Sequence, residues 1–135
     1  MPLGEGHRFP VTKYRLLRDE LARHDGFIFE PAPLASLDEI RAVHDPDYVE
    51  AFHTGTISGP AMRRIGFPWS QGLVTRTLAS AGGTLAATRE ALVTGLGCTL
   101  AGGTHHALAS KVRASACSTI SPVPFGDFWL TRELP

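Results

Sequence analysis

Apolar residues recur at helical spacing in two long segments of the chain. The first segment, residues 11–24, is followed by Gly26, which is typical of a helix end. The second, residues 70–94, starts at the candidate N-cap Ser70 and ends before Gly95. Both are therefore predicted to be helices with one apolar face. The two faces comprise Val11, Tyr14, Leu17 and Leu21, and Leu73, Val74, Leu78, Ala81, Leu85 and Leu92.

Shorter elements are predicted between these helices. The stretch "FIFEP", residues 27–31, is aromatic and β-branched and ends in proline, which is typical of a strand. Ser36 and Glu39 have capping-box spacing, so a short helix is predicted to start there. In "DPDYVEAFHTG", Asp45 is a candidate N-cap with proline at the first helical position, and the predicted helix closes near Gly55.

The stretch "TISGPAMRRIGFPW", residues 56–69, contains many helix-breaking residues and is predicted to be a surface loop. Arg63 and Arg64 lie within it. They are candidates for holding an acidic ligand, but a pair of charges on a solvated loop is the favoured explanation.

Two further features bear on the architecture. Gly82 and Gly83 each cost the long helix about 1 kcal/mol relative to alanine, which indicates either close packing of another backbone or a kink. Residues 97–101 are predicted to be a buried strand that runs into a glycine turn, with Cys98 as a small buried hydrophobic residue. The order strand, helices, strand favours an α/β layer architecture with parallel strands.

Composition narrows the class of protein. The chain has 135 residues, 43% of them hydrophobic and 19% charged, with a formal net charge of zero, so we expect one domain without the basic patch that nucleic-acid binding requires. No apolar run approaches the roughly 20 residues of a membrane span. The start "MPLGEGHRFP" is polar and does not resemble a signal peptide. We therefore expect a cytoplasmic chain with no membrane partner, in which Cys98 and Cys117 are free thiols.

The candidate chemistry lies in "GGTHHA", where His105 and His106 follow the glycines of the predicted turn. Successive side chains diverge on a strand or a helix, so adjacent histidines are poorly placed to bind one metal ion together. Two separate roles fit better, one histidine as general base and its neighbour as a hydrogen-bonding or charged partner. The carboxyl end of a strand in an open α/β sheet is a common ligand site. The alternative is that the pair only closes a loop through hydrogen bonds to carbonyl groups.

Other polar residues are weaker candidates. His44, Asp45 and Asp47 cluster in the sequence, but Asp45 is already explained as a helix start. His7 and His53 suggest no chemistry of their own.

Several stretches together resemble one family. They are "GHRFPVTKYRLL", "HDPDYVEAFHTGTI", "RRIGFPWS", "LVTRTLASAGGTLAATREAL" and "LAGGTHHA". Their order and spacing resemble those of the histone deacetylase superfamily, and most closely its bacterial acetoin-utilisation and class IV-like branch. The likeness runs from about Gly6 to Ala107, and the tandem histidines are its most specific part.

The resemblance implies the arginase/deacetylase fold, a three-layer α/β/α sandwich around a mostly parallel sheet. It also implies a zinc-dependent hydrolase that cleaves acetyl-lysine-type amides, or amides of acetylated small amines such as polyamines. By the same resemblance, His106 is the general base, His105 its electrostatic partner, and Gly102 and Gly103 the turn that places them.

The chain departs from the family after the tandem histidines. The resemblance places the zinc ligands in an Asp-x-His motif and a later Asp, yet Asp127 is the only aspartate after His106 and no histidine follows. The family's C-terminal tyrosine has no counterpart either, since Tyr14 and Tyr48 are the only tyrosines. We therefore expect an N-terminal portion with an incomplete sheet, no tight zinc binding and no activity by itself. A non-enzymatic interaction fragment is the alternative.

The last segment suggests a reason for this departure. Residues 1–111 are predicted to be deacetylase-like, and residues 112–135 to be a poorly ordered tail in which Phe125, Phe128 and Trp129 show no helix or strand pattern. The family has a "GFCVFNDIA"-like block where this chain has "RASACSTIS". Permitted codons for "RASACSTIS", read in a shifted frame, translate as that block. We therefore predict a one-base deletion near codons 111–113, in the gene itself or in its sequencing.

Overall fold

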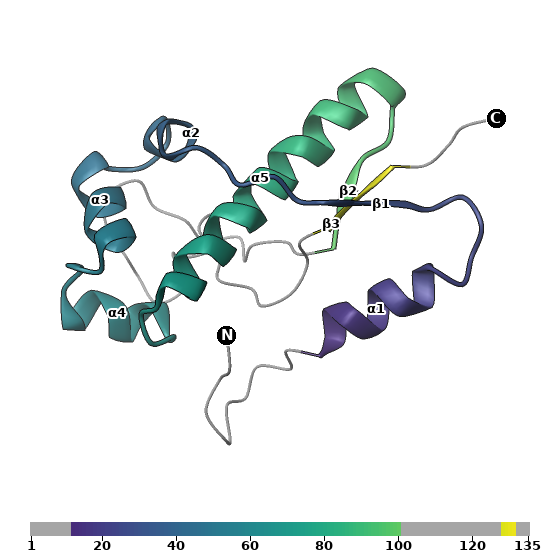
Figure 1. Cartoon of the computed structure of the whole chain (residues 1–135). Helices are drawn as coiled ribbons and strands as arrows, with labels where there is room; N and C mark the ends of the chain where they lie inside the picture. The colour runs from purple at the N-terminus through teal and green to yellow at the C-terminus, as the bar shows by residue number, and fades with distance from the viewer. Residues whose placement is uncertain (1–11, 101–127, 132–135) are drawn as a thin grey trace.

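The computed structural model describes residues 12–100 and 128–131 (Figure 1). Within these residues the chain forms five helices and three short strands. In chain order they are α1 (Lys13–Leu21), β1 (Ile28–Pro31), α2 (Leu37–Arg41), α3 (Pro46–Thr54), α4 (Gly59–Ile65), α5 (Gln71–Thr94), β2 (Cys98–Thr99) and β3 (Phe128–Thr131).

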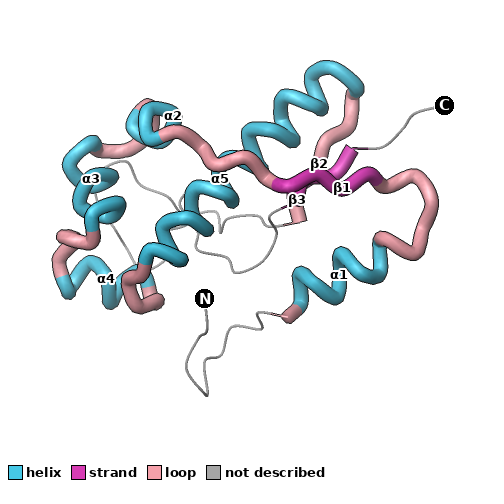
Figure 2. The backbone as a smooth tube through the Cα atoms, in the orientation of Figure 1, coloured by secondary structure: helices cyan, strands magenta, loops and turns pink. Residues whose placement is uncertain are grey.

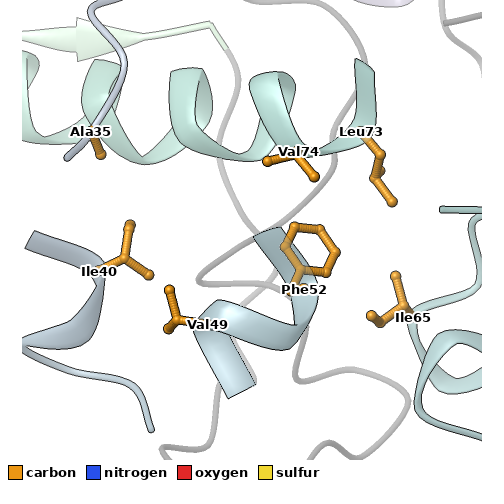
Figure 3. Close-up of a cluster of buried hydrophobic side chains, with 7 residues drawn as sticks. All are labelled: Ala35, Ile40, Val49, Phe52, Ile65, Leu73 and Val74. Carbon is orange, nitrogen blue, oxygen red and sulfur yellow. The ribbon is translucent and has the colours of Figure 1, made fainter. Parts of the chain in front are cut away.

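The core forms where α2, α3 and α4 meet the first half of α5. Figure 3 shows Val49 and Phe52 of α3 pointing toward Val74 of α5, with Leu73 and Ile65 beside them. The buried cluster comprises Ala35, Ile40, Val49, Phe52, Ile65, Leu73 and Val74. Removal of these apolar side chains from water stabilises the packing of α2, α3 and α4 against α5.

The predicted starts of α2 and α3 are confirmed by their hydrogen bonds. The Ser36 hydroxyl accepts a hydrogen bond from the Glu39 amide, and the Glu39 carboxylate accepts one of 2.8 Å from the Ser36 amide, which is a complete capping box. The Asp45 carboxylate accepts from the amides of Asp47 and Tyr48, and α3 ends at Gly55 with a φ of 81°. These short helices follow from local sequence alone.

The prediction of a loop over residues 56–69 is wrong for its central part, which forms α4. The Ser58 hydroxyl caps this helix, proline lies in its first turn, and Gly66 ends it with a φ of 79°. The residues that suggested a loop therefore occupy positions that helices favour. Burial of Ile65 in the core supplies the tertiary contact that so short a helix needs.

The first predicted helix is confirmed as α1, but its described apolar face is only partly covered. None of its residues is buried, and Leu17 retains 45% of its accessible surface. In Figure 1, α1 lies apart from the other helices and joins β1 through the bend at Gly26. The sequence periodicity therefore predicted the helix correctly but not a packing partner.

The sheet differs from the parallel arrangement expected from the sequence. Its strand order is β1-β3-β2, and both described ladders are antiparallel. Since β1 and β2 each run antiparallel to β3, they run parallel to one another without being neighbours. The three strands lie side by side in one sheet next to α5 (Figure 2).

The middle strand comes from the segment predicted as a poorly ordered tail. Residues 128–131 form β3, so the expectation that this stretch has no strand pattern is wrong for these residues. Residues 112–127 and 132–135 lie outside the described residues, and their predicted lack of order stays a prediction.

The predicted long helix is confirmed as α5, which begins after Ser70 and ends at Gly95. Its helical structure continues without interruption through Gly82 and Gly83, so the pair marks no break in the helix. A Cβ atom at Gly82 would lie 1.9 Å from the carbonyl oxygen of Pro33, inside any allowed contact distance. The Ala35 amide donates a 3.0 Å hydrogen bond to the carbonyl of Leu78, one turn before Gly82. Close packing of another backbone is therefore the correct interpretation of Gly82, whereas Gly83 faces side-chain atoms of Ala32 and Thr99.

The apolar stripe of α5 is covered at its start and exposed at its end. Leu73 and Val74 are fully buried, whereas Leu92 retains 83% and Val93 84% of their accessible surface. Leu92, a member of the predicted apolar stripe, is therefore left uncovered. A search of the described helices finds none with the length and apolar character needed to cross a membrane.

Candidate functional site

The segment that carries the candidate chemistry follows directly on β2. Gly102, Gly103, His105 and His106 lie outside the described residues, so their predicted roles stay predictions. The described chain reaches Leu100, which is buried.

Two glycines set the position of β2 against α5. A Cβ atom at Gly97 would lie 2.0 Å from the carbonyl oxygen of Ala87, so the chain entering β2 passes directly over the helix backbone. Gly83 faces Thr99, whose hydroxyl oxygen lies 3.3 Å from the ideal Cβ position. The contact at Gly97 leaves no room for a Cβ atom, and together with the tighter-than-usual contact at Gly83 it fixes where β2 starts. Residues 102–106 therefore follow a strand that is held at Gly97, just before it, and at Thr99.

Cys98 corrects the sequence interpretation. It was expected to be a small buried hydrophobic residue, but its side chain is exposed and its thiol is free. Neighbouring residues of a strand face opposite sides. Cys98 therefore points outward where the residues flanking it point inward. An exposed thiol at β2 is a useful probe of this strand.

The three residues His44, Asp45 and Asp47 lie in two different environments. Asp45 caps α3, as predicted, and Asp47 lies in the first turn of that helix. His44 is 7% exposed, and among the described residues neither ring nitrogen has a hydrogen-bond partner. Burial without a partner disfavours the charged ring and lowers the pKa of His44 below its ordinary value of 6.5. Sequence reasoning gave His44 little weight, because its burial depends on contacts distant in sequence.

We predict that His44 makes the stability of the chain depend on pH. Its folded pKa is lowered, so the unfolded chain binds the proton more readily, and the free energy of unfolding falls as the pH drops below about 6.5. Chemical denaturation at several pH values between about 5 and 8 measures this slope. His44→Gln should flatten it in that range, whereas His24→Gln, at an exposed histidine, should keep it. An equal slope in parent and His44→Gln would contradict the assignment.

His53 lines a small apolar cavity of about 10 Å³ between α2, α3 and α5. That volume is close to the space of one water molecule, so this cavity is too small for an acetylated side chain. Thr77 lines the same cavity and is 1% exposed, and its hydroxyl has no partner among the described residues. The cavity belongs to the core and not to a substrate site.

Arg63 and Arg64 are exposed in the last turn of α4. Positive charge is favourable at the C-terminal end of a helix, where it complements the helix dipole. This placement accounts for the pair without an acidic ligand. His7, the remaining histidine considered from the sequence, lies outside the described residues.

Comparison with known proteins identifies the family. The model of the histone deacetylase domain matches residues 7–115, most of the chain and including the tandem histidines. The chain belongs to the histone deacetylase family. It is also similar to an uncharacterized protein of Picosynechococcus sp., with 48% identity over 111 residues that cover 78% of this chain and 36% of that protein. The chain therefore spans about a third of the length of this curated relative.

Histone deacetylase membership implies an arginase/deacetylase type of α/β fold. The family generally uses zinc. In residues 12–100, no group of three His, Cys, Asp or Glu side chains lies close enough to hold a metal ion. A catalytic zinc site needs three protein ligands and an open position. The donors described here do not fit such a site.

Proposed function

We propose that residues 1–111 are the N-terminal part of a zinc-dependent deacetylase of acetyl-lysine-type amides, and that this polypeptide has little or no activity by itself. The observation that carries the proposal is the family match over residues 7–115, which includes the tandem histidines. The close-packed entry into β2 supports it, because that strand leads directly to residues 102–106.

The same proposal includes the frameshift. The family match stops at residue 115, close to the deletion proposed near codons 111–113. Downstream of it, the sequence supplies Asp127 but no histidine, so an Asp-x-His ligand motif is missing. A deletion at this point explains why the tandem histidines and a complete ligand set do not occur together. Asp127 and Cys117 then have no role in the chemistry.

In the complete domain, His106 is the general base that takes a proton from the attacking water, and His105 stabilises the developing charge. Adjacent histidines suit such separate tasks because their side chains diverge. Gly102 and Gly103 permit the tight turn that brings them to the carboxyl end of the strand. The substrate is an acetylated lysine or an acetylated small amine.

A second candidate function is a non-enzymatic interaction fragment in the cytoplasm. The observation that favours it is the exposed apolar surface of Leu92 and Val93 at the end of α5, with Leu96 beyond it. Exposed apolar side chains grouped in sequence are typical of surfaces that bind another chain. This candidate needs neither zinc nor turnover.

A zinc-content and hydrolysis assay on two forms of the protein tests the proposal. We expect no stoichiometric zinc and no hydrolysis of acetyl-lysine peptides by the chain as it stands. The form with one G restored near codon 112, extended to the downstream reading frame, should contain zinc and turn over. Stoichiometric zinc and turnover by the unrestored chain would contradict the proposed inactivity.

Sequencing of the locus tests the frameshift. Absence of "GFCVFNDIA" in the shifted frame would contradict the proposed one-base deletion.

A further inference from the structure

In the structure, β1 and β2 lie one strand's width apart, and β3 lies between them. These strands are parallel to one another, are not hydrogen-bonded to one another, and are both paired with β3. The two outer strands of such a sheet are separated by two strand-to-strand spacings of about 4.8 Å each. Without the middle strand, the facing edges of β1 and β2 would each present unpaired amide and carbonyl groups.

The residues that form this space and the residues that fill it differ in origin. β1 and β2 lie inside the family match over residues 7–115, whereas Phe128–Thr131 lies outside it. A segment that does not belong to the matched domain nevertheless pairs with both domain strands, with Leu130 opposite Phe29 on one side and Cys98 on the other. Pairing of this kind depends mainly on backbone hydrogen bonds and is therefore tolerant of sequence.

We propose that the space between β1 and β2 is an acceptor site for an extended apolar peptide, and that the chain's own Phe128–Thr131 is an exchangeable occupant of it. The four residues Phe-Trp-Leu-Thr carry no charge and are rich in types that favour strands. The helix α5 lies against this position and contacts both β2 and β3, so an apolar strand is favoured over a charged one (Figure 2). The partner is accordingly an uncharged, aromatic and β-branched or aliphatic segment that adds as an antiparallel strand.

Attachment to the same chain gives the resident segment an advantage over a free peptide. The tether keeps Phe128–Thr131 at an effective concentration in the millimolar range. A free peptide therefore competes poorly with the resident strand but should bind well when that strand cannot pair. Proline at a middle-strand position removes a donor and is not tolerated between two partners.

The first experiment tests the register in the full chain through Cys98. Leu130→Cys, combined with Cys117→Ser to remove the other thiol, places a thiol at the position paired with Cys98. Paired strand positions have Cα separations of about 4.5–5.5 Å, within the range of disulfides. Oxidised glutathione should give a monomeric disulfide at least about tenfold faster than in Trp129→Cys, the neighbouring position paired with Thr99. Equal rates, or disulfide-linked dimers, would overturn the assignment of the resident strand.

The second experiment tests the exchange. A synthetic peptide covering residues 125–133, with cysteine at the position of Leu130, is offered to the full-length Cys117→Ser chain under the same oxidant. We expect at least tenfold more capture by Cys98 when the chain also carries Leu130→Pro, and little capture of the same peptide with proline at the position of Trp129. Circular dichroism of the Leu130→Pro chain checks that its helices remain. Equal capture of the unmodified and the proline-containing peptides, or no gain from Leu130→Pro in a helical chain, would overturn the proposal. A loss of helix on this substitution would also overturn it.

Discussion

Gly82→Ala is expected to lower the free energy of unfolding by about 3 kcal/mol or more, despite alanine's higher helix propensity. Alanine gains about 1 kcal/mol in a helix interior. Against this, the new methyl group would lie 1.9 Å from the carbonyl oxygen of Pro33 and 2.7 Å from the amide nitrogen of Ala35. Both are backbone atoms, and the Ala35 amide is tied to α5 through its hydrogen bond to Leu78. Overpacking against atoms that cannot rotate away forces the segment off the helix.

Gly83→Ala is the matched control for this prediction. It has the same gain in propensity on the same helix, but its methyl group would meet only the Cβ of Ala32 at 3.1 Å and the hydroxyl of Thr99 at 3.3 Å. These contacts are tight without being prohibitive, so we expect the free energy of unfolding to stay within about 1 kcal/mol of the parent's. Urea unfolding followed by helical circular dichroism measures both variants. A Gly82→Ala chain as stable as Gly83→Ala would contradict the close approach of residues 33–35 to α5.

His106→Ala in the frame-restored protein is expected to lower kcat by a factor on the order of 10² to 10⁴. That is the contribution of a general base positioned on the attacking water. Loss of the base affects the proton transfer and not the fit of the acetylated side chain, so KM should change little. His105→Ala should also lower kcat. Steady-state kinetics on an acetyl-lysine peptide measures these effects, with zinc content determined on the same samples.

His24→Ala is the control for the catalytic prediction, because this histidine is exposed next to α1 and its side chain keeps 63% of its accessible surface. Its kcat should equal that of the parent. A His106→Ala enzyme that keeps the parental kcat, with unchanged zinc content, would remove His106 from the role of base. A proportional loss of zinc and activity would instead show that the residue acts by holding the metal.

Much of the secondary structure could be predicted because the information is local. Ser36 with Glu39, Asp45 with its proline, and Ser70 with Gly95 mark helix ends through hydrogen bonds that span only a few residues. The failure at residues 56–69 has the same local origin. Glycine and proline count against a helix interior but are favoured at helix ends, and only the burial of Ile65 shows which applies.

The candidate site could be predicted only as a motif. The pair His105 and His106 was found from its glycines and its place after a strand, whereas the burial of His44 and the exposure of Cys98 were not foreseen. Burial of one side chain depends on which distant segments pack over it, and periodicity within an element cannot supply that information. The signal for His44 was its position between two short amphipathic helices.

By itself, the sequence determined the helices α1, α2, α3 and α5, the strand positions of β1 and β2, and the motif that links the chain to the histone deacetylases. Each of these depends on residues a few positions apart. Only the tertiary structure decided that Gly82 lies under the backbone of Pro33, that α1 is only partly covered and the end of α5 lacks cover, and that residues 128–131 pair between β1 and β2. These are contacts between segments tens of residues apart. They depend on which surfaces the folded chain leaves open, and no local pattern encodes that.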